Sequence, residues 1–182
     1  RIAESNNAKL LELILNHQSI IDMNIINDAF FYACLKNHIS IAFYLFEKYP
    51  KMDITHNGEL TVMLINNNAI KTLQWLHLLN PKSLKITNAM MICKAKCNNY
   101  ELMRWLYETF DLDICFNNDE ILKHTIINGD MEVVLWILEL TPNKNIDNRC
   151  MWSCKNGYIQ ILKCLYVLNP DYDLESILKV LH

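Results

Sequence analysis

The sequence predicts an all-α protein, a helical-repeat solenoid of helix-turn-helix units with a period of about 30 residues. Three features that recur in phase along the chain give this prediction. The first is proline, because the spacings between successive prolines are 31, 61 and 28 residues, or one, two and one steps of a single period. The prolines are Pro50, Pro81, Pro142 and Pro170. A period of about 20–50 residues is typical of solenoids, whose units bury apolar faces only against their neighbours.

The second feature is a corner rich in asparagine or glycine between two apolar segments. The corners are Asn6-Asn7, Asn37-His38, Asn67-Asn68, Asn98-Asn99, Asn128-Gly129 and Asn156-Gly157. Asparagine and glycine tolerate the positive φ that ends a helix where the chain reverses. The third feature follows about seven residues later, where an aromatic residue usually precedes an aliphatic one, as at Trp75-Leu76 and Trp136-Ile137. We therefore expect each corner to separate the two helices of a unit.

Within a unit the pattern predicts a first helix, the corner, a second helix and a proline. In the last full unit, Trp152 precedes the corner, and apolar residues resume after it at helical spacing. These later residues are Ile159, Ile161, Leu162, Leu165 and Leu168. Pro170 then ends the second helix, because the residue before a proline is pushed out of the α region and proline lacks an amide donor.

A polar residue after each connecting segment is the predicted N-cap of the next first helix. Such residues stand at Asn27-Asp28, Asn88, Asn118-Asp119 and Asp147-Asn148. The third unit lacks the proline, and Phe110-Asp111-Leu112 stands in its place. We expect a different exit from the second helix there.

These boundaries predict a single array over residues 1–182. It comprises a partial unit at 1–26, units at 27–54, 55–86, 87–114, 115–146 and 147–174, and the start of another at 175–182. The terminal units lack the polar outer faces that capping repeats need. We expect either a piece of a longer array or ends that another protein covers.

Two corners carry a family resemblance. Residues 128–138, Asn-Gly-Asp-Met-Glu-Val-Val-Leu-Trp-Ile-Leu, are similar to the ankyrin-repeat signature Asn-Gly-His-Leu-Glu-Ile-Val-Lys-Leu-Leu-Leu, and residues 156–166 match it nearly as well. Residues 31–37 resemble the first helix of that family. The chain thus resembles a divergent ankyrin-repeat protein over essentially its whole length. The unit is shorter than that of the family, so we expect loops or turns where the family has β-hairpins.

The bias toward asparagine and isoleucine and the scarcity of glycine resemble the ankyrin-like arrays of large DNA viruses. This resemblance implies a non-enzymatic protein-interaction scaffold that acts on host proteins in the host cytoplasm. A role in presenting host proteins to a ubiquitin ligase follows by analogy alone. The alternative is a structural component of a virion or large assembly, whose repeat ends are covered by neighbouring subunits.

Composition limits the kinds of partner and of chemistry that the sequence predicts. No apolar run approaches the ~18 residues of a membrane span, and a formal net charge of −3 with interleaved signs favours neither nucleic acid nor an anionic membrane. The seven cysteines have no disulfide-scaffold spacing and are predicted to be reduced, buried thiols. The chain has no glycine-rich phosphate loop and no catalytic constellation, so no enzyme activity or cofactor is predicted.

Two sets of residues admit a functional reading and a packing reading. Cys93 and Cys97, with Cys150 and Cys154 and His124, are metal-ligand types, but the two pairs lie two repeats apart. The recurring Trp75, Trp105 and Trp136 could stack on bases, but they lack a basic groove. We expect packing roles for both sets, with each tryptophan filling the seam to the next unit.

The ankyrin resemblance implies that a protein partner binds in the concave groove formed by the first helices and the loops between units. The corresponding residues are Tyr32, Lys36, Met63, Asn67, Lys94, Lys96, Lys123 and Lys155 on first helices, and Thr55, His56, Asn57, Asn117 and Asn118 in loops. The lysines favour an acidic partner, and a merely solvated helix face is the alternative. The sequence does not indicate an oligomeric state.

Overall fold

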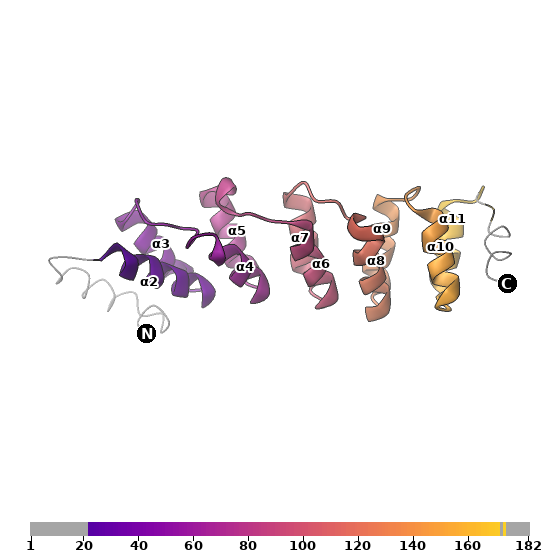
Figure 1. The fold of residues 1–182 in the computed structure, drawn as a ribbon, viewed down its shortest axis with the longest axis horizontal. Helices are drawn as coiled ribbons and strands as arrows, with labels where there is room; N and C mark the ends of the chain where they lie inside the picture. Colours follow the sequence, from indigo (N-terminus) through magenta and orange to yellow (C-terminus); the bar gives the residue numbers. More distant parts are fainter. Residues whose placement is uncertain (1–21, 172, 174–182) are drawn as a thin grey trace. The chain divides into compact units, whose positions relative to one another are not determined.

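The computed structural model describes residues 22–171 and residue 173, and within them the chain is all-α, as predicted (Figure 1). Ten α-helices and one short 3-10 helix account for its regular structure, and these described residues contain no strand. In these residues loops and turns connect successive helix pairs, as expected, where the ankyrin family has β-hairpins. The corner at Asn6-Asn7 and the predicted start of a unit at 175–182 lie outside the described residues.

The helices form five successive pairs, each made of a first and a second helix joined by a short corner. The pairs are α2 (Met23–Leu35) with α3 (Ile39–Lys48), α4 (Glu59–Asn66) with α5 (Ile70–Leu79), α6 (Asn88–Lys96) with α7 (Tyr100–Thr109), α8 (Phe116–Asn128) with α9 (Met131–Leu140), and α10 (Ile146–Lys155) with α11 (Ile159–Leu168). The 3-10 helix η1 (Pro81–Ser83) follows α5. Such short connections favour antiparallel neighbours.

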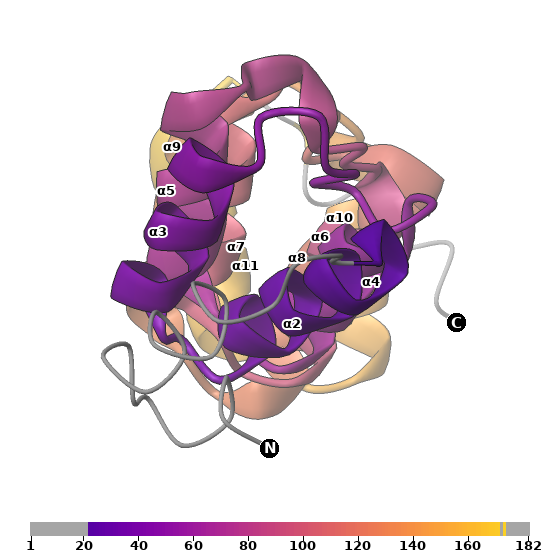
Figure 2. The same ribbon diagram turned by 90° about the vertical axis from the view of Figure 1, so that its left-hand side faces the viewer.

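The chain divides into two compact halves between Met90 and Met91. In the N-terminal half, α2 packs against both α3 and α4, and the first helices lie on one side with the second helices on the other (Figure 2). Its core includes the fully buried side chains of Phe30, Ile41, Leu45, Leu64, Leu73 and Leu76.

The C-terminal half repeats this arrangement. Here α8 packs on α9, α10 packs on α11, and α9 also packs on α11. Its core contains Met91, Met103, Ile121, Val134, Ile137 and Cys150, all fully buried. Each half therefore consists of a layer of first helices over a layer of second helices.

The corners explain why the chain reverses between the helices of a pair. One residue in each described corner has a positive φ, as predicted, with values of 56–60° at Asn37, Asn68 and Asn98 and 74–81° at Gly129 and Gly157. At every corner the amide of this residue and the next amide donate to carbonyls of the last helical turn, as with Asn98 N to Ala95 O and Asn99 N to Lys94 O. These two hydrogen bonds together form the Schellman motif.

In two corners a side chain also caps the N-terminus of the second helix. Asn99 Oδ1 accepts a hydrogen bond from Leu102 N at 3.1 Å, and Asp130 Oδ1 accepts one from Val133 N at 3.2 Å. The corner of these pairs therefore satisfies backbone groups of both helices.

The prolines stand where they were predicted, each two residues after the end of a second helix. The residues that precede them have left the α region; Asn80, for example, has φ −153° and ψ 92°. In the third pair, Phe110 ends α7 with a more extended ψ of 148°, which is the different exit that we expected.

Several starts of first helices were predicted wrongly. The expected N-cap residues Asn27-Asp28 lie inside α2, whose N-cap is Asp22, with its carboxylate accepting from Asn24 N at 2.9 Å. Asp147-Asn148 lie inside the first turn of α10, which begins at Ile146. A polar residue in the first turn and a polar N-cap look alike in sequence, because both suit the positive end of a helix.

The ring contacts of Trp75 and Trp136 run toward the preceding pair, whereas contacts with the next pair were expected, and Trp105 meets Phe110 at the end of its own helix. Trp75 of α5 lies 6.2 Å from Phe30 of α2 between ring centroids. Trp136 of α9 meets Tyr107 of α7 edge to face at 5.5 Å, and the Arg104 guanidinium covers the same indole at 4.9 Å. These contacts bind successive pairs together within each half.

The left-handed corner gives a stability prediction at Asn98, whose side chain is exposed. Asn98→Ala should destabilise the chain by about 1 kcal/mol, because a Cβ without a local hydrogen-bonding group is disfavoured at positive φ. Asn98→Gly is the matched control and should be as stable as the original chain or slightly more stable. Urea unfolding followed by circular dichroism measures both. Equal stability of the two variants would contradict the role of the corner.

Candidate functional site

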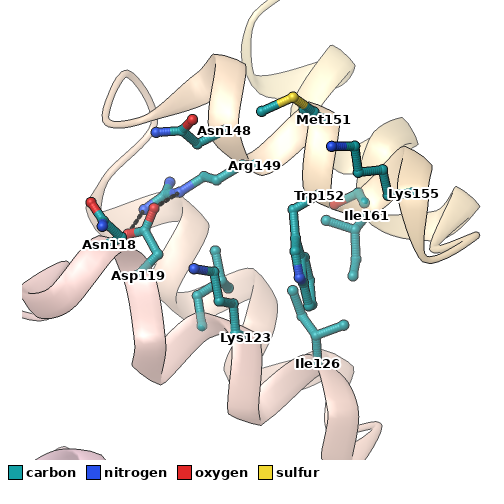
Figure 3. A pocket seen from close by; sticks show the side chains of 12 residues that line it. Asn118, Asp119, Lys123, Ile126, Asn148, Arg149, Met151, Trp152, Lys155 and Ile161 are labelled. Atoms are coloured by element: carbon teal, nitrogen blue, oxygen red, sulfur yellow. Dashed lines mark hydrogen bonds and ion pairs between the residues drawn. The ribbon is translucent and has the colours of Figure 1, made fainter. Parts of the chain in front are cut away.

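A pocket of about 280 Å³ lies between α8 and α10 in the C-terminal half (Figure 3). Its wall is apolar and consists of Leu122, Ile126, Met151, Trp152 and Ile161. Polar side chains border it, namely Asn118, Lys123, Asn148, Ser153 and Lys155, together with the ion pair of Asp119 and Arg149. Asn118, Lys123 and Lys155 were predicted from the sequence, and the structure brings these three together.

The pocket is built beside a buried ion pair. Asp119 and Arg149 are each 3 % exposed, and the guanidinium binds the carboxylate with two hydrogen bonds, Nε to Oδ2 at 3.0 Å and Nη2 to Oδ1 at 2.9 Å. Since the two residues belong to the first helices of successive pairs, this bidentate contact joins α8 to α10.

Neighbouring groups satisfy the remaining hydrogen-bonding capacity of the pair. Arg149 Nη1 donates to Thr141 O at 2.8 Å, and Arg149 Nη2 donates to Thr141 Oγ1 at 2.9 Å. Asn145 Nδ2 donates to Asp119 Oδ2 at 3.1 Å. Arg149 Nη2 also reaches Cys115 Sγ at 3.5 Å, where burial and then the Asp119 carboxylate raise the pKa of the thiol. The ion pair is therefore a connected structural network.

The backbone that carries Asp119 is left-handed over three residues. Asn117, Asn118 and Asp119 have φ of 55°, 56° and 60°. Consecutive left-handed residues are unfavourable for L-amino acids, and asparagine and aspartate tolerate them best. Asp119, the last of these three residues, carries the carboxylate that binds Arg149, and Asn118 before it borders the pocket.

Three polar groups of the pocket form no hydrogen bond or ion pair with a described side chain. Lys123 is half-buried and Lys155 is exposed, and neither forms a salt bridge or hydrogen bond within residues 22–171. Ser153 is 1 % exposed, and its Oγ has no hydrogen-bond partner among these residues. Figure 3 shows Trp152 reaching from α10 toward Ile126, with Lys123 on one side of the indole and Lys155 on the other.

Lys96 and Asn117 belong to a neighbouring surface cluster around Glu120. Lys96 Nζ lies 2.7 Å from Glu120 Oε1, Asn117 Nδ2 donates to Oε2, and His124 Nε2 lies 3.5 Å from Oε1. Hydrogen bonds from Lys96 and Asn117 lower the pKa of Glu120 to about 2. Lys96 is therefore engaged by a carboxylate of its own chain.

A second, more open hollow of about 460 Å³ lies at the corners of the N-terminal half. Lys36 and Asn67, both predicted site residues, border it together with Leu35, Asn37, Asn68, Ala69, Ile70 and Lys71. Its lining comes from corner residues and the start of α5. It lacks the aromatic wall of the α8–α10 pocket.

The other predicted residues of the N-terminal half lie on α2, on α4 and in the loop before α4. Tyr32 and Met63 are 45 % and 40 % exposed. His56 meets the ring of Phe31 edge to face at 4.3 Å, and His56 Nε2 lies 3.4 Å from Asp28 Oδ1. The structure therefore places His56 against α2, where it packs.

Asp53 organises this loop. Its carboxylate accepts hydrogen bonds from Thr55 N at 2.9 Å, Thr55 Oγ1 at 2.6 Å and Asn57 N at 2.7 Å. Burial acts to raise the pKa of Asp53, and these hydrogen bonds outweigh it and lower the pKa. Thr55 is thus a structural residue, while Asn57 keeps an exposed side chain at a positive φ of 57°.

The expectation that Lys94 offers a charge to the groove was wrong. Lys94 is 2 % exposed and lies among the largest buried side chains of the chain. Counted from the left-handed corner residue, Lys94 stands where α8 has the buried Thr125 and α10 has the buried Ser153, so this position faces the core. The predicted line of lysines is interrupted at this helix.

The cysteines and the other possible metal ligands form no further site in the described residues. All seven cysteines are free, and burial raises the pKa of Cys34 and Cys115 and that of Cys150 to about 11. In residues 22–171 no group of three or more histidine, cysteine or acidic side chains is arranged to hold a metal ion. No described helix combines the length and apolar character that crossing a bilayer needs.

Sequence reasoning missed Asp119, Arg149, Trp152 and Ser153 as parts of one site. A signal was present for the first two, because opposite charges one period apart on successive first helices are placed to meet. No comparable signal pointed to Ser153. The comparisons add no identification, since no family model, curated protein or solved structure matches the chain.

The buried ion pair gives the largest predicted stability effect. Asp119→Asn tolerates the same left-handed backbone but leaves the Arg149 guanidinium buried without a counter-charge, so it should cost about 3–5 kcal/mol. Lys144→Gln is the control, because Lys144 and Asp113 form an exposed pair at 4.0 Å, whose loss should cost less than about 1 kcal/mol. Urea unfolding measures both. A loss below about 1 kcal/mol for Asp119→Asn would refute this role.

The Glu120 cluster predicts a pH dependence. The folded-state pKa of about 2 lies below the ordinary value of 4.5, so the stabilisation by Glu120 is present above about pH 4.5 and is lost as the pH falls toward 2. The stability difference between the original chain and Glu120→Gln should shrink over this interval. Lys96→Met should remove most of the same dependence, because Lys96 is the main cause of the shift. Denaturant titrations at several pH values test this, and a constant difference would rule it out.

Proposed function

We propose that this chain is a non-enzymatic protein-interaction scaffold, a divergent ankyrin-like helical-repeat solenoid with a period of about 30 residues. The proposed binding face is the surface of the first helices and of the loops before them. The observation that carries the proposal is the pocket between α8 and α10, which gathers Asn118, Lys123 and Lys155 beside an apolar wall.

The recurrence of the corners supports the repeat. The left-handed residues at Asn37, Asn68, Asn98, Gly129 and Gly157 are spaced by 31, 30, 31 and 28 residues. Each carries the same pair of backbone hydrogen bonds. Units that share a corner and pack on their neighbours are the elements from which solenoids are built.

The state of the charged groups supports binding in preference to catalysis. Asp119 and Arg149, the titratable pair next to the pocket, are occupied by each other and by Thr141. A general acid or base needs a proton that it can exchange with a substrate, and these groups are held in a static network. The side chains that remain available, Lys123 and Lys155, suit electrostatic recognition of an acidic partner.

The biological setting is proposed from the resemblance in the sequence. The likeness to arrays of large DNA viruses favours a viral protein that engages host proteins in the host cytoplasm. A link to a ubiquitin ligase remains an extension of that analogy.

A structural role in a virion or large assembly is the second candidate. Ile159, Tyr166 and Val167 are 63 %, 52 % and 76 % exposed, and their spacing places them on one face of α11. Exposed apolar faces of this kind are commonly covered by another subunit. On this alternative, α11 and not the surface of the first helices mediates the contacts.

The test is affinity purification from host-cell lysate with matched charge reversals. The combined Lys36→Glu, Lys123→Glu and Lys155→Glu variant should lose a specific protein partner, because all three lysines border the proposed face. The control combines Lys51→Glu, Lys85→Glu and Lys163→Glu, three exposed lysines outside the two hollows, with the same change in net charge. Circular dichroism verifies that both variants are helical.

Retention of the partner by the control and its loss from the first variant would support the scaffold. An unchanged set of partners in both variants, together with loss of partners in a Tyr166→Ser and Val167→Ser variant, would favour the assembly role.

A further inference from the structure

The size and wall of the α8–α10 pocket suit a protein side chain. Its volume of about 280 Å³ falls below the roughly 300–1,000 Å³ of typical small-molecule sites. Trp152 and Ile126 supply aromatic and aliphatic surface from opposite helices, and Figure 3 shows the indole directed toward Ile126. A single apolar side chain inserted there would be removed from water on several sides.

The charge of the pocket is positive once internal pairing is counted. Asp119 and Arg149 neutralise each other through two hydrogen bonds of 3.0 Å and 2.9 Å. Lys123 and Lys155 have no anionic partner within the described chain, so the net charge at the rim comes from them. A carboxylate between these lysines would gain charge-assisted hydrogen bonds.

Ser153 is an independent sign of a ligand. The residue is 1 % exposed and its Oγ is buried, yet the hydroxyl forms no hydrogen bond to any described group. Leaving a buried hydroxyl without a partner costs about 1–3 kcal/mol. Because Ser153 lines the pocket, a polar atom of a bound molecule can supply the missing hydrogen bond.

The rim can also hold an extended backbone. Asn118 and Asn148 border the pocket from α8 and α10, and each amide can both donate and accept. A bound extended segment presents unpaired N–H and C=O groups that match them.

From these observations we propose that the α8–α10 pocket binds an acidic peptide segment of a partner protein. One apolar side chain of the segment packs on Trp152, and a neighbouring aspartate or glutamate lies between Lys123 and Lys155. Ser153 donates to, or accepts from, the same segment. This inference rests on the proposed scaffold function and specifies which chemistry the scaffold recognises.

The experiment selects ligands without assuming a partner. A phage-displayed library of short unstructured peptides is enriched on the purified chain, and the enriched peptides are synthesised with a fluorescent label. Fluorescence anisotropy then gives Kd. We expect the enriched peptides to place Asp or Glu within one or two residues of Leu, Ile, Met or Phe. Replacing that acid by its amide should weaken binding about tenfold or more, the loss of one charge-assisted contact.

Variants of the chain locate the binding. Lys123→Gln with Lys155→Gln should weaken binding about tenfold or more, and Ser153→Ala should weaken it several-fold. The matched control, Lys51→Gln with Lys163→Gln, removes the same charge and should change Kd less than about twofold. Circular dichroism confirms folding, and the glutamines preserve length and polarity at half-buried or exposed positions.

Three results would overturn the inference: no peptide is enriched, the enriched peptides lack acidic residues, or the pocket variants bind as the control does. The outcome is separable from that of the scaffold function. A partner captured from lysate that is insensitive to Lys123 and Lys155 would leave a scaffold whose recognition site is elsewhere. Peptide binding without any lysate partner would support the pocket and not the scaffold.

Discussion

A single residue at positive φ closes the first helix of every described pair, and the packing of both halves depends on it. The reversal brings the second helix back along the first, so that apolar residues on both can share a core. Asparagine performs this at Asn37, Asn68 and Asn98, and glycine at Gly129 and Gly157. At Asn99 and Asp130 the next residue also caps the second helix, so one short segment satisfies backbone groups of two helices.

The second constraint is the ion pair that joins two successive helix pairs. Asp119 and Arg149 bring two opposite charges into a region from which water is excluded, where their desolvation is offset only by a complete set of hydrogen bonds. Thr141 and Asn145 complete that set. The network includes Asp119, the last of three left-handed residues before the regular part of α8. The strained backbone and the ion pair therefore meet at Asp119, beside the pocket.

The candidate site illustrates how far periodicity can locate function. Lys123 and Lys155 belong to successive first helices, and the structure places both at one pocket. Lys94 also belongs to a first helix, yet it is buried, because it stands four residues before the left-handed corner residue, the place of the buried Thr125 in α8. Lys96 is exposed but already engaged by Glu120. Membership of a first helix therefore does not make a lysine available, because its position relative to the corner decides its burial and neighbouring carboxylates decide its pairing.

The sequence by itself determined the all-α class, the pairing of helices, the left-handed corners and the exits at proline. Each of these follows from local chemistry, since asparagine, glycine and proline restrict the backbone within a few residues of themselves. Only the tertiary structure decided the start of α2, the burial of Lys94, and the meeting of Asp119, Arg149, Trp152 and Ser153 at one pocket. These depend on contacts between residues about 30 positions apart, whose geometry is set by how helices pack and not by the residues adjacent in the chain.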